Sequence, residues 1–338
     1  MIGDRLSTFD STSTGLTFLT DREILSVFKK GSGSGGWSNN TITSFNGRKL
    51  FMKLLPLPAL ELSHPYDTRN LYHLPLEMNR SGIGVNTWRE LLVLVKTTNW
   101  VLSGRIYNFP LLYHYRIVKR RSRSLNSLEI RDYVERWGNK RGIRERTEDA
   151  QNSQYSLLLC IEYIGPTLVH WLNSRRRLEL YLSQTKMILG FLESEGVLLF
   201  DNHSHNILTD NHNNIYFTDF GLVLDRQFEL TESERRFFQT NITYPYAYAF
   251  SNPFFLVFDR QEVLNSLRIK FDLKEDITIR DDILPHLLEF CKLMGFTARG
   301  VSILQKYGDI VTKFGKAHET FPMKYPSKVM DRLIWEVK

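Results

Sequence analysis

The chain has 338 residues, of which 42% are hydrophobic and 24% are charged, and its formal net charge is +7. This composition is typical of a folded globular protein and excludes a disordered or collagen-like chain. Its two cysteines, Cys160 and Cys291, lie far apart in apolar runs, which excludes a disulfide framework and a cysteine-based metal site. No stretch reaches the ~20 apolar residues that span a bilayer, and the first residues lack a signal-peptide pattern. We therefore expect a cytoplasmic protein without a membrane span.

Positive charge is concentrated between Arg116 and Arg146, where eleven Lys/Arg and four Asp/Glu give a net charge of +7. Such a segment attracts anionic partners, including nucleic acid, acidic protein and membrane surfaces. Neither a pattern of stacking aromatic residues nor a nucleic-acid-binding motif accompanies it. We therefore favour a solvated loop and helix, and we do not expect nucleic acid to be the partner.

The first residues, 1–22, are rich in Ser and Thr and predict an irregular or strand-forming lead-in, with one short helical turn after Thr20 as N-cap. Residues 25–30 predict a strand that runs directly into a glycine-rich stretch. That stretch satisfies G-x-G-x-x-G, with two serines inside it: Gly31, Ser32, Gly33, Ser34 and Gly36.

The segment after the glycines predicts a hairpin. Residues 37–43 have no helical periodicity, and Asn46-Gly47 is a strong hairpin-turn signal. The next apolar run, 49–55, carries Lys53 in its middle. We therefore expect the order strand, glycine turn, strand, Asn-Gly turn, strand. Glycines let backbone N–H groups approach phosphate oxygens, and a lysine supplies a point charge to them.

Residues 56–85 contain four prolines and predict an insertion, after which Asn86 caps a helix. Glu90 lies in the first turns of this helix and is our candidate partner for Lys53. Two other acidic residues, Glu61 and Glu77, are closer to the lysine in sequence and compete for that role.

The middle of the chain predicts two more strands and a helical insertion. Residues 109–117 predict a strand, and a basic insertion at 119–153 contains a helix near 127–137. Residues 155–164 then predict a buried strand that ends at Gly165-Pro166. Two helices follow, over residues 167–174 and 178–195.

The stretch Phe200–Gly221 carries two carboxylates and one carboxamide at fixed intervals. Asp201 stands five residues before Asn206, and Asp219 opens an Asp-Phe-Gly triplet thirteen residues after Asn206. Between them, two short apolar runs flank a polar turn at 210–214, which predicts a β-hairpin. Carboxylate and amide oxygens are the ligands that Mg²⁺ prefers, so Asn206 and Asp219 are candidate metal ligands.

The C-terminal part predicts helices. A capping box begins at Thr231, and helices are expected near 253–269, 281–294, 298–314 and 327–337. A strand-rich first part and a helical second part predict an α+β architecture with two lobes, residues 1–164 and 165–338.

The order of these motifs resembles the protein-kinase-like superfamily, which has a glycine-rich loop, a third-strand lysine, a helix with a matching glutamate, D-x-x-x-x-N and D-F-G. The resemblance covers most of residues 25–225. It implies the two-lobed kinase-like fold and transfer of the γ-phosphoryl group of ATP with Mg²⁺. The last N-lobe strand would end in the interlobe hinge, where backbone groups of Glu162 and Ile164 would contact adenine.

The resemblance also assigns roles to the motif residues. Lys53, oriented by Glu90, would hold the α- and β-phosphates, and Asp219 and Asn206 would hold Mg²⁺. Asp201 would orient the acceptor hydroxyl. His203 could neutralise charge on the γ-phosphoryl when protonated, or it could form only a turn hydrogen bond. Phosphorylation of Ser32 or Ser34 would oppose nucleotide phosphates through like charge.

Three features depart from eukaryotic-type kinases. Leu199 and Phe200 stand where those enzymes have His-Arg, so an activating phosphate has no arginine there to bind. His203 replaces the lysine two residues after the catalytic aspartate, as in the D-x-H-x-x-N loop of aminoglycoside and choline phosphotransferases. No Ala-Pro-Glu follows the Asp-Phe-Gly triplet. The whole pattern resembles a bacterial kinase-like branch.

These departures leave the acceptor open. A protein Ser/Thr acceptor is our first interpretation, and a small-molecule acceptor of the aminoglycoside or choline type is the alternative. A non-catalytic kinase-like scaffold is disfavoured because every polar catalytic position is filled. An AMP-transferring enzyme is disfavoured because Asp201 is present.

Overall fold

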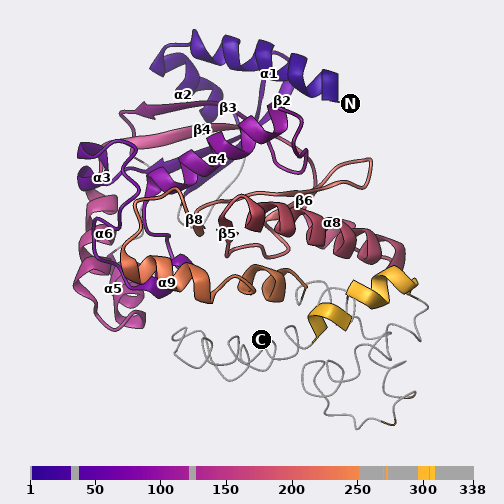
Figure 1. The fold of residues 1–338 in the computed structure, drawn as a ribbon. Coiled ribbons are helices and arrows are strands. Elements are labelled where there is room, and N and C mark those ends of the chain that lie inside the picture. The colour runs from indigo at the N-terminus through magenta and orange to yellow at the C-terminus, as the bar shows by residue number, and fades with distance from the viewer. Residues whose placement is uncertain are drawn as a thin grey trace. The chain divides into compact units, whose positions relative to one another are not determined.

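The structure is a computed structural model that describes residues 2–31, 38–121, 127–250, 269, 272, 296–303 and 305–308. The chain forms two compact units (Figure 1). Unit 1 comprises residues 1–164 together with 220–223 and 228–230, and unit 2 comprises the remaining residues. Within the described residues the secondary structure is mixed α and β, with a small antiparallel sheet.

Unit 1 is built around one four-stranded antiparallel sheet. Its strands are β1 (Asn39–Phe45), β2 (Arg48–Pro56), β3 (Leu112–Val118) and β4 (Ser156–Glu162), in the order β1-β2-β4-β3. Asn46 and Gly47 both have positive φ, of 49° and 77°, as a type I′ hairpin turn requires, and the predicted Asn-Gly hairpin is confirmed. Every residue of β4 before Glu162 is buried, which makes it the centre of the core.

The N-terminal segment is helical, and the prediction of an irregular or extended lead-in is wrong. Helix α1 covers Ile2–Thr17 and packs on β3. The Ser11 and Thr17 hydroxyls donate to the carbonyls four residues earlier, so these side chains bond within the helix. Arg5 joins α1 to the rest of unit 1 through four hydrogen bonds, to the Glu162 carboxylate and to the Tyr107 and Phe109 carbonyl groups. These contacts outweigh the modest helix propensity of the sequence.

Helix α2 covers Asp21–Lys29, so the strand predicted at 25–30 is also wrong. The predicted N-cap, Thr20, is present and forms a capping box with Glu23. Ile24 and Phe28, four residues apart, form the buried side of the helix, which is the periodicity that the strand interpretation overlooked. In Figure 1, α1 and α2 lie on the upper side of the sheet.

The other helices of unit 1 lie between the strands in sequence, some between β2 and β3 and others between β3 and β4. They are α3 (Ala59–Ser63), the 3₁₀ helix η1 (Leu76–Asn79), α4 (Thr87–Leu102), α5 (Ser127–Arg136) and α6 (Arg141–Asn152). The helices predicted after Asn86 and near 127–137 are confirmed as α4 and α5, whereas α6 was not predicted. Residues of both insertions share one apolar cluster, which contains Tyr72, Met78, Tyr133, Val134 and Ile143. Unit 1 is therefore richer in helix than the sequence predicts.

The described part of unit 2 contains the helices α7, α8 and α9, further helical residues near the C-terminus and two small strand pairs. The elements are α7 (Leu168–Trp171), α8 (Arg175–Ser194), β5 (Val197–Leu199), β6 (Ile207–Thr209), β7 (Ile215–Phe217), β8 (Val223–Asp225) and α9 (Glu232–Thr240). Strand β5 pairs with β8, and β6 pairs with β7 in the predicted hairpin. Residues 298–303 and 305–308 are helical, and the helices predicted near 253–269, 281–294 and 327–337 lie almost wholly outside the described residues.

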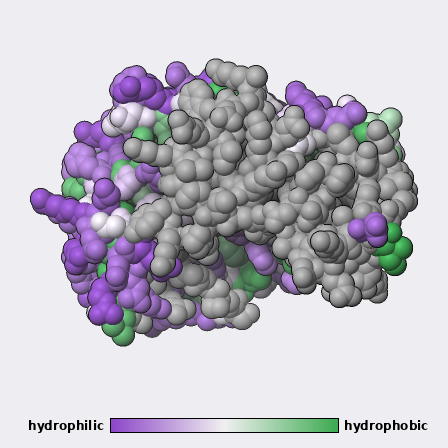
Figure 2. Space-filling model, turned by 90° about the horizontal axis from the view of Figure 1, so that it is seen from below, coloured by the Kyte–Doolittle hydropathy of each residue, from purple (hydrophilic) through white to green (hydrophobic). Residues whose placement is uncertain are grey.

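Cationic side chains of the basic segment 116–146 bind other groups within unit 1. Arg116 donates to the Leu19 and Thr17 carbonyl groups near the end of α1, and Arg146 is buried in an ion pair with Glu61. In Figure 2, the described surface at the left, the side on which α5 and α6 lie in Figure 1, is mostly hydrophilic. Across the part of the chain that the structure describes, no helix combines the length and apolar character needed to cross a bilayer.

Candidate functional site

The predicted pair of Lys53 and Glu90 is present in unit 1. Lys53 lies in the middle of β2, opposite Asn40 of β1 and Leu159 of β4. Its Nζ atom is 2.7 Å from Oε1 of Glu90, which lies in the first turn of α4. The lysine is 7% exposed and the glutamate 5% exposed, so both charges are removed from water. Burial of two charges is costly unless they are paired, and the short contact supplies that pairing.

The start of α4 fixes the position of Glu90. The Asn86 side chain accepts from the Trp88 N–H, and the Glu61 carboxylate accepts from the Thr87 N–H at 2.8 Å. Two of the N–H groups that lack an intrahelical partner are thereby satisfied. Glu61 also pairs with Arg146 at 3.0 Å, and Glu77 belongs to η1. Of the three carboxylates considered for Lys53, Glu90 is the one that lies against its ammonium group.

In unit 2, the loop after β5 brings Asp201, His203 and Asn206 together. Asn206 donates through Nδ2 to the Asp201 carbonyl at 2.9 Å and to its carboxylate at 3.1 Å. His203 Nε2 lies 3.7 Å from Asp201 Oδ1, while its Nδ1 accepts from the His205 N–H. The Asp201 side chain is 30% exposed. The loop therefore presents a partly exposed carboxylate that is oriented by an amide on one side and flanked by an imidazole on the other.

The β6–β7 hairpin carries Asn206 and Asp219 at the same end. Ile207 is paired with Phe217, and the Thr218 N–H donates to the Asn206 carbonyl at 3.1 Å. Asp219 follows immediately and has φ of 61°, in the left-handed region that non-glycine residues seldom occupy. Strained backbone of this kind is concentrated at functional sites.

The donor set of this hairpin fits a hard cation. Because Asn206 uses Nδ2 for Asp201, its amide oxygen is the atom that it can offer to a metal, and Asp219 adds a carboxylate. Mg²⁺ is usually held by one or two protein carboxylates together with substrate phosphates and water. Within the described ranges no cluster of three or more His, Cys, Asp or Glu side chains could hold a metal, so a protein-only cage is not found there.

The glycine-rich stretch does not have the predicted surroundings. It follows a helix, α2, rather than a strand, so it is not the turn of a β-hairpin. Gly31 packs so closely against Thr41 and Ile42 of β1 that a Cβ atom there would clash with both. Its other members, Ser32, Gly33, Ser34 and Gly36, lie outside the described residues.

The predicted hinge residues are only partly available. The Glu162 N–H donates to the Leu111 carbonyl at 2.8 Å, so this N–H is not available to a ligand. The Glu162 carboxylate accepts from Arg5 through Nε at 2.9 Å and Nη2 at 2.6 Å. Ile164 is the last residue of the first stretch of unit 1. The expectation that backbone groups of Glu162 and Ile164 contact adenine stays a prediction, in which the Glu162 N–H takes no part because Leu111 engages it.

Two arginines belong to the surroundings of the site and were missed in the sequence. Arg5 binds the Glu162 carboxylate, although the two residues lie 157 positions apart in the sequence. Arg89, directly before Glu90, is 1% exposed and donates through Nε to the Thr68 carbonyl at 2.7 Å. For Arg89, the sequence does offer a signal, because a buried side of α4 that starts at Trp88 and includes Leu91 leaves little room for a solvated neighbour.

No protein-family model matches the chain, and a comparison with curated proteins gives no match. The functional assignment therefore depends on the residues and their geometry.

Proposed function

We propose that the chain is an ATP- and Mg²⁺-dependent phosphotransferase with a two-lobed kinase-like fold, acting on Ser or Thr of a protein. The observation that carries the proposal is the buried ion pair between Lys53 of β2 and Glu90 of α4, whose charged atoms are 2.7 Å apart. Replacing a buried ion pair by apolar residues is often neutral or stabilising, so such a pair is weak support for a structural role. A role in binding phosphate gives a reason to keep it.

The second support is the arrangement of the loop and hairpin in unit 2. Asp201 presents a partly exposed carboxylate, and Asn206 and Asp219 supply two hard oxygen ligands from one end of a hairpin. Bound Mg²⁺ would neutralise charge on the nucleotide phosphates. The carboxylate of Asp201 would accept a hydrogen bond from the acceptor hydroxyl, orient its oxygen and take its proton. Lys53 would hold the α- and β-phosphates and Glu90 would hold Lys53.

The proposal uses Lys53, Glu90, Asp201, Asn206 and Asp219 and does not depend on the glycine-rich stretch. That stretch follows a helix, and its central residues lie outside the described part. The proposal also does not require the Glu162 amide. Adenine recognition would use the Glu162 carbonyl or the backbone of Ile164, both at the end of unit 1.

A small-molecule acceptor is the second candidate. The observation that favours it is the imidazole of His203, 3.7 Å from the Asp201 carboxylate, at the position where protein kinases have a lysine. An acceptor bound beside an imidazole and a carboxylate can be a hydroxylated or cationic small molecule of the aminoglycoside or choline type.

Incubation with γ-labelled ATP and Mg²⁺ tests both candidates, with casein-like protein mixtures in one arm and hydroxylated amines in the other. The Asp219→Ala variant should abolish transfer. Lys53→Met should also abolish it, whereas Lys49→Met, an exposed lysine on the same strand, is the matched control and should leave it unchanged. Absence of nucleotide binding by calorimetry would overturn the proposal.

A further inference from the structure

Residues that follow Asp219 return to unit 1 at two places, and both returns are made onto the insertion before α4. The returning segments are 220–223 and 228–230. The contacts involve residues 59–84 of the insertion, which we call the anchoring segment, the first turn of α4, and Phe109. Because Glu90 lies in that same turn, these contacts connect the segment after the Asp-Phe-Gly triplet to the Lys53–Glu90 pair.

The first return is at Gly221. A Cβ atom on Gly84 would clash with the Gly221 carbonyl oxygen, and Gly84 has φ of 73°. Only glycine combines this backbone conformation with such a close approach. Next to it, Phe220 is fully buried and packs on Phe109, with ring centroids 6.1 Å apart. The two residues after Asp219 are thus fixed by unit 1.

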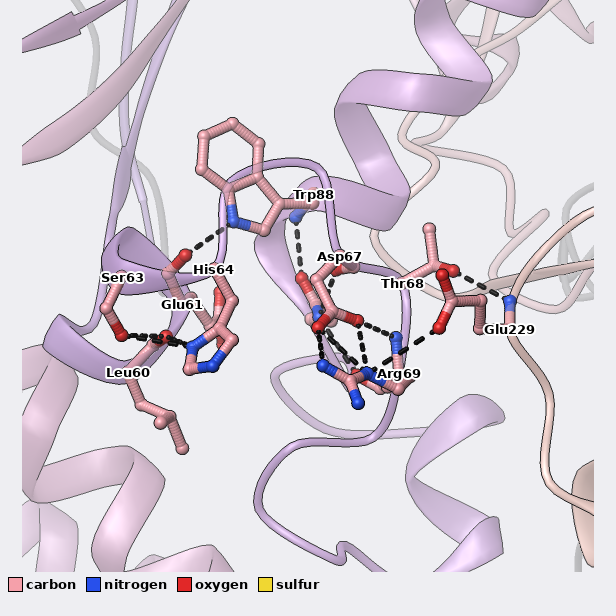
Figure 3. A network of polar contacts seen from close by, with 10 residues as sticks. Leu60, Glu61, Ser63, His64, Asp67, Thr68, Arg69, Trp88 and Glu229 are labelled. Carbon is pink, nitrogen blue, oxygen red and sulfur yellow. Dashed lines mark hydrogen bonds and ion pairs between the residues drawn. The ribbon is translucent and has the colours of Figure 1, made fainter.

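The second return is at Phe228 and Glu229. The Glu229 N–H donates to Thr68 Oγ1 at 2.8 Å, a contact drawn in Figure 3. The Arg89 guanidinium lies over the Phe228 ring at 5.2 Å from its centroid, and Phe228 is buried. A desolvated cation–π contact of this kind is among the stronger ones. Arg69 lies 3.6 Å from the Glu229 carboxylate, but both side chains are more than half exposed, so this pair contributes little.

The anchoring segment is itself held rigidly to α4. Arg89 donates to the Thr68 carbonyl at 2.7 Å and to Asn79 Oδ1 at 3.2 Å. Figure 3 shows the Trp88 indole donating to the Glu61 carbonyl, at 2.8 Å. Arg89 therefore contacts both the anchoring segment and the returning chain, while its neighbour Glu90 holds Lys53.

We propose that the anchoring segment and Arg89 keep the 220–230 segment in its catalytically competent arrangement without phosphorylation. This inference rests on the proposed phosphotransfer function. In it, Thr68 and Arg89 are positioning residues that take the place of a phosphate-binding arginine before Asp201, where the chain has Leu199 and Phe200. The uncharged hydroxyl of Thr68 makes with the Glu229 backbone a contact that needs no modification of either residue.

The test compares Thr68→Val, which removes the acceptor hydroxyl at nearly constant volume, with Thr68→Ser, which keeps it. In Thr68→Val, we expect the Glu229 amide to exchange hydrogen about fivefold faster, the factor for one lost hydrogen bond. We expect kcat to fall by a similar factor, while the KM for ATP changes by less than about twofold. Thr68→Ser should behave like the wild type. Arg69→Met should do so as well, because it removes the exposed pair with Glu229 and the side-chain bonds to Asp67 but leaves the Thr68 hydroxyl in place.

Phosphatase treatment of the wild-type protein should leave its rate unchanged. Unchanged exchange at Glu229 in Thr68→Val overturns the anchoring contact, and faster exchange with an unchanged kcat reduces that contact to a structural one. A rate lost on phosphatase treatment overturns the independence from phosphorylation. If the wild-type chain transfers no phosphate to any acceptor, the proposed function fails and the positioning role with it, while the exchange measurement still reports whether the contact exists.

Discussion

Removal of one member of the Lys53–Glu90 pair tests whether the pair serves structure or chemistry. At 2.7 Å, the gross attraction between the two charges is about 6 kcal/mol with an effective dielectric constant of 20. The cost of burying both charges offsets most of it, and breaking such a pair typically costs ~3–5 kcal/mol. Lys53→Met leaves Glu90 buried and unpaired, so we expect a loss of that size in the free energy of unfolding, measured by urea denaturation.

The double variant Lys53→Met/Glu90→Leu separates stability from activity. It leaves no buried charge, so we expect its stability to return to within ~1 kcal/mol of the wild type. Phosphotransfer and nucleotide affinity should stay lost in both variants, because the phosphates have lost their cation.

The control for this pair is Arg146→Met, which breaks the buried Arg146–Glu61 pair of the same unit but leaves both acceptors at the start of α4, the Glu61 carboxylate and the Asn86 side chain. It should cost a similar amount of stability and leave the rate per folded molecule intact. Activity in the double variant, or equal loss of activity in Arg146→Met, would refute the functional interpretation of Lys53–Glu90.

Three further predictions follow from single contacts. Arg5→Met should lower the free energy of unfolding by ~2–3 kcal/mol, because it removes a charged pair with Glu162 that is less than one-fifth exposed; thermal unfolding measures this. Asp201→Asn should lower kcat by ~10²–10⁴ while ATP still binds, as kinetics and calorimetry would show. Partial burial raises the pKa of the Asp210 carboxyl, but the hydrogen bonds it accepts, chiefly from Asn214, outweigh burial and hold its pKa below its usual value. Asp210→Asn should therefore lower the free energy of unfolding by ~1 kcal/mol at pH 7, a figure discounted for exposure. This difference between variant and wild type should be lost as the pH falls from ~4 through the lowered pKa of Asp210. Urea unfolding of both proteins at pH 7 and at pH 3 checks it.

The parts of the site that could be predicted are those specified by local signals. Lys53 lies in a short apolar run after an Asn-Gly turn, and Glu90 follows a helix N-cap at Asn86. The hairpin that carries Asn206 and Asp219 is marked by two apolar runs around a polar turn. In each case, the residues that determine the conformation are neighbours in the sequence, so the pattern alone is sufficient.

The parts that could not be predicted depend on contacts between distant residues. Helix α1 has a Ser/Thr-rich sequence with little apolar periodicity, and Arg5 anchors it to Glu162, 157 positions away. Helix α6 is highly charged, and its buried side includes Arg146, which is acceptable there only because Glu61 lies against it from 85 positions away. Helix propensity and binary pattern contain no information about such partners, and tertiary contacts override them.

The residues around Asp201 hold in place the loop that would be the catalytic loop of the proposed phosphotransferase. Phe200 is fully buried and packs between Phe237 and Tyr244, with ring centroids 5.9 and 5.4 Å away. Asn202 is fully buried as well and donates to the Pro245 carbonyl at 2.9 Å. Asp201 therefore lies between two fully buried neighbours, one packed among aromatic rings and one held by a buried hydrogen bond. An arginine at position 200 would need a phosphate to order the loop, whereas an apolar residue orders it as soon as the core forms. The sequence alone shows that the arginine is absent, and the packing gives a reason why the proposed phosphotransferase would not need one there.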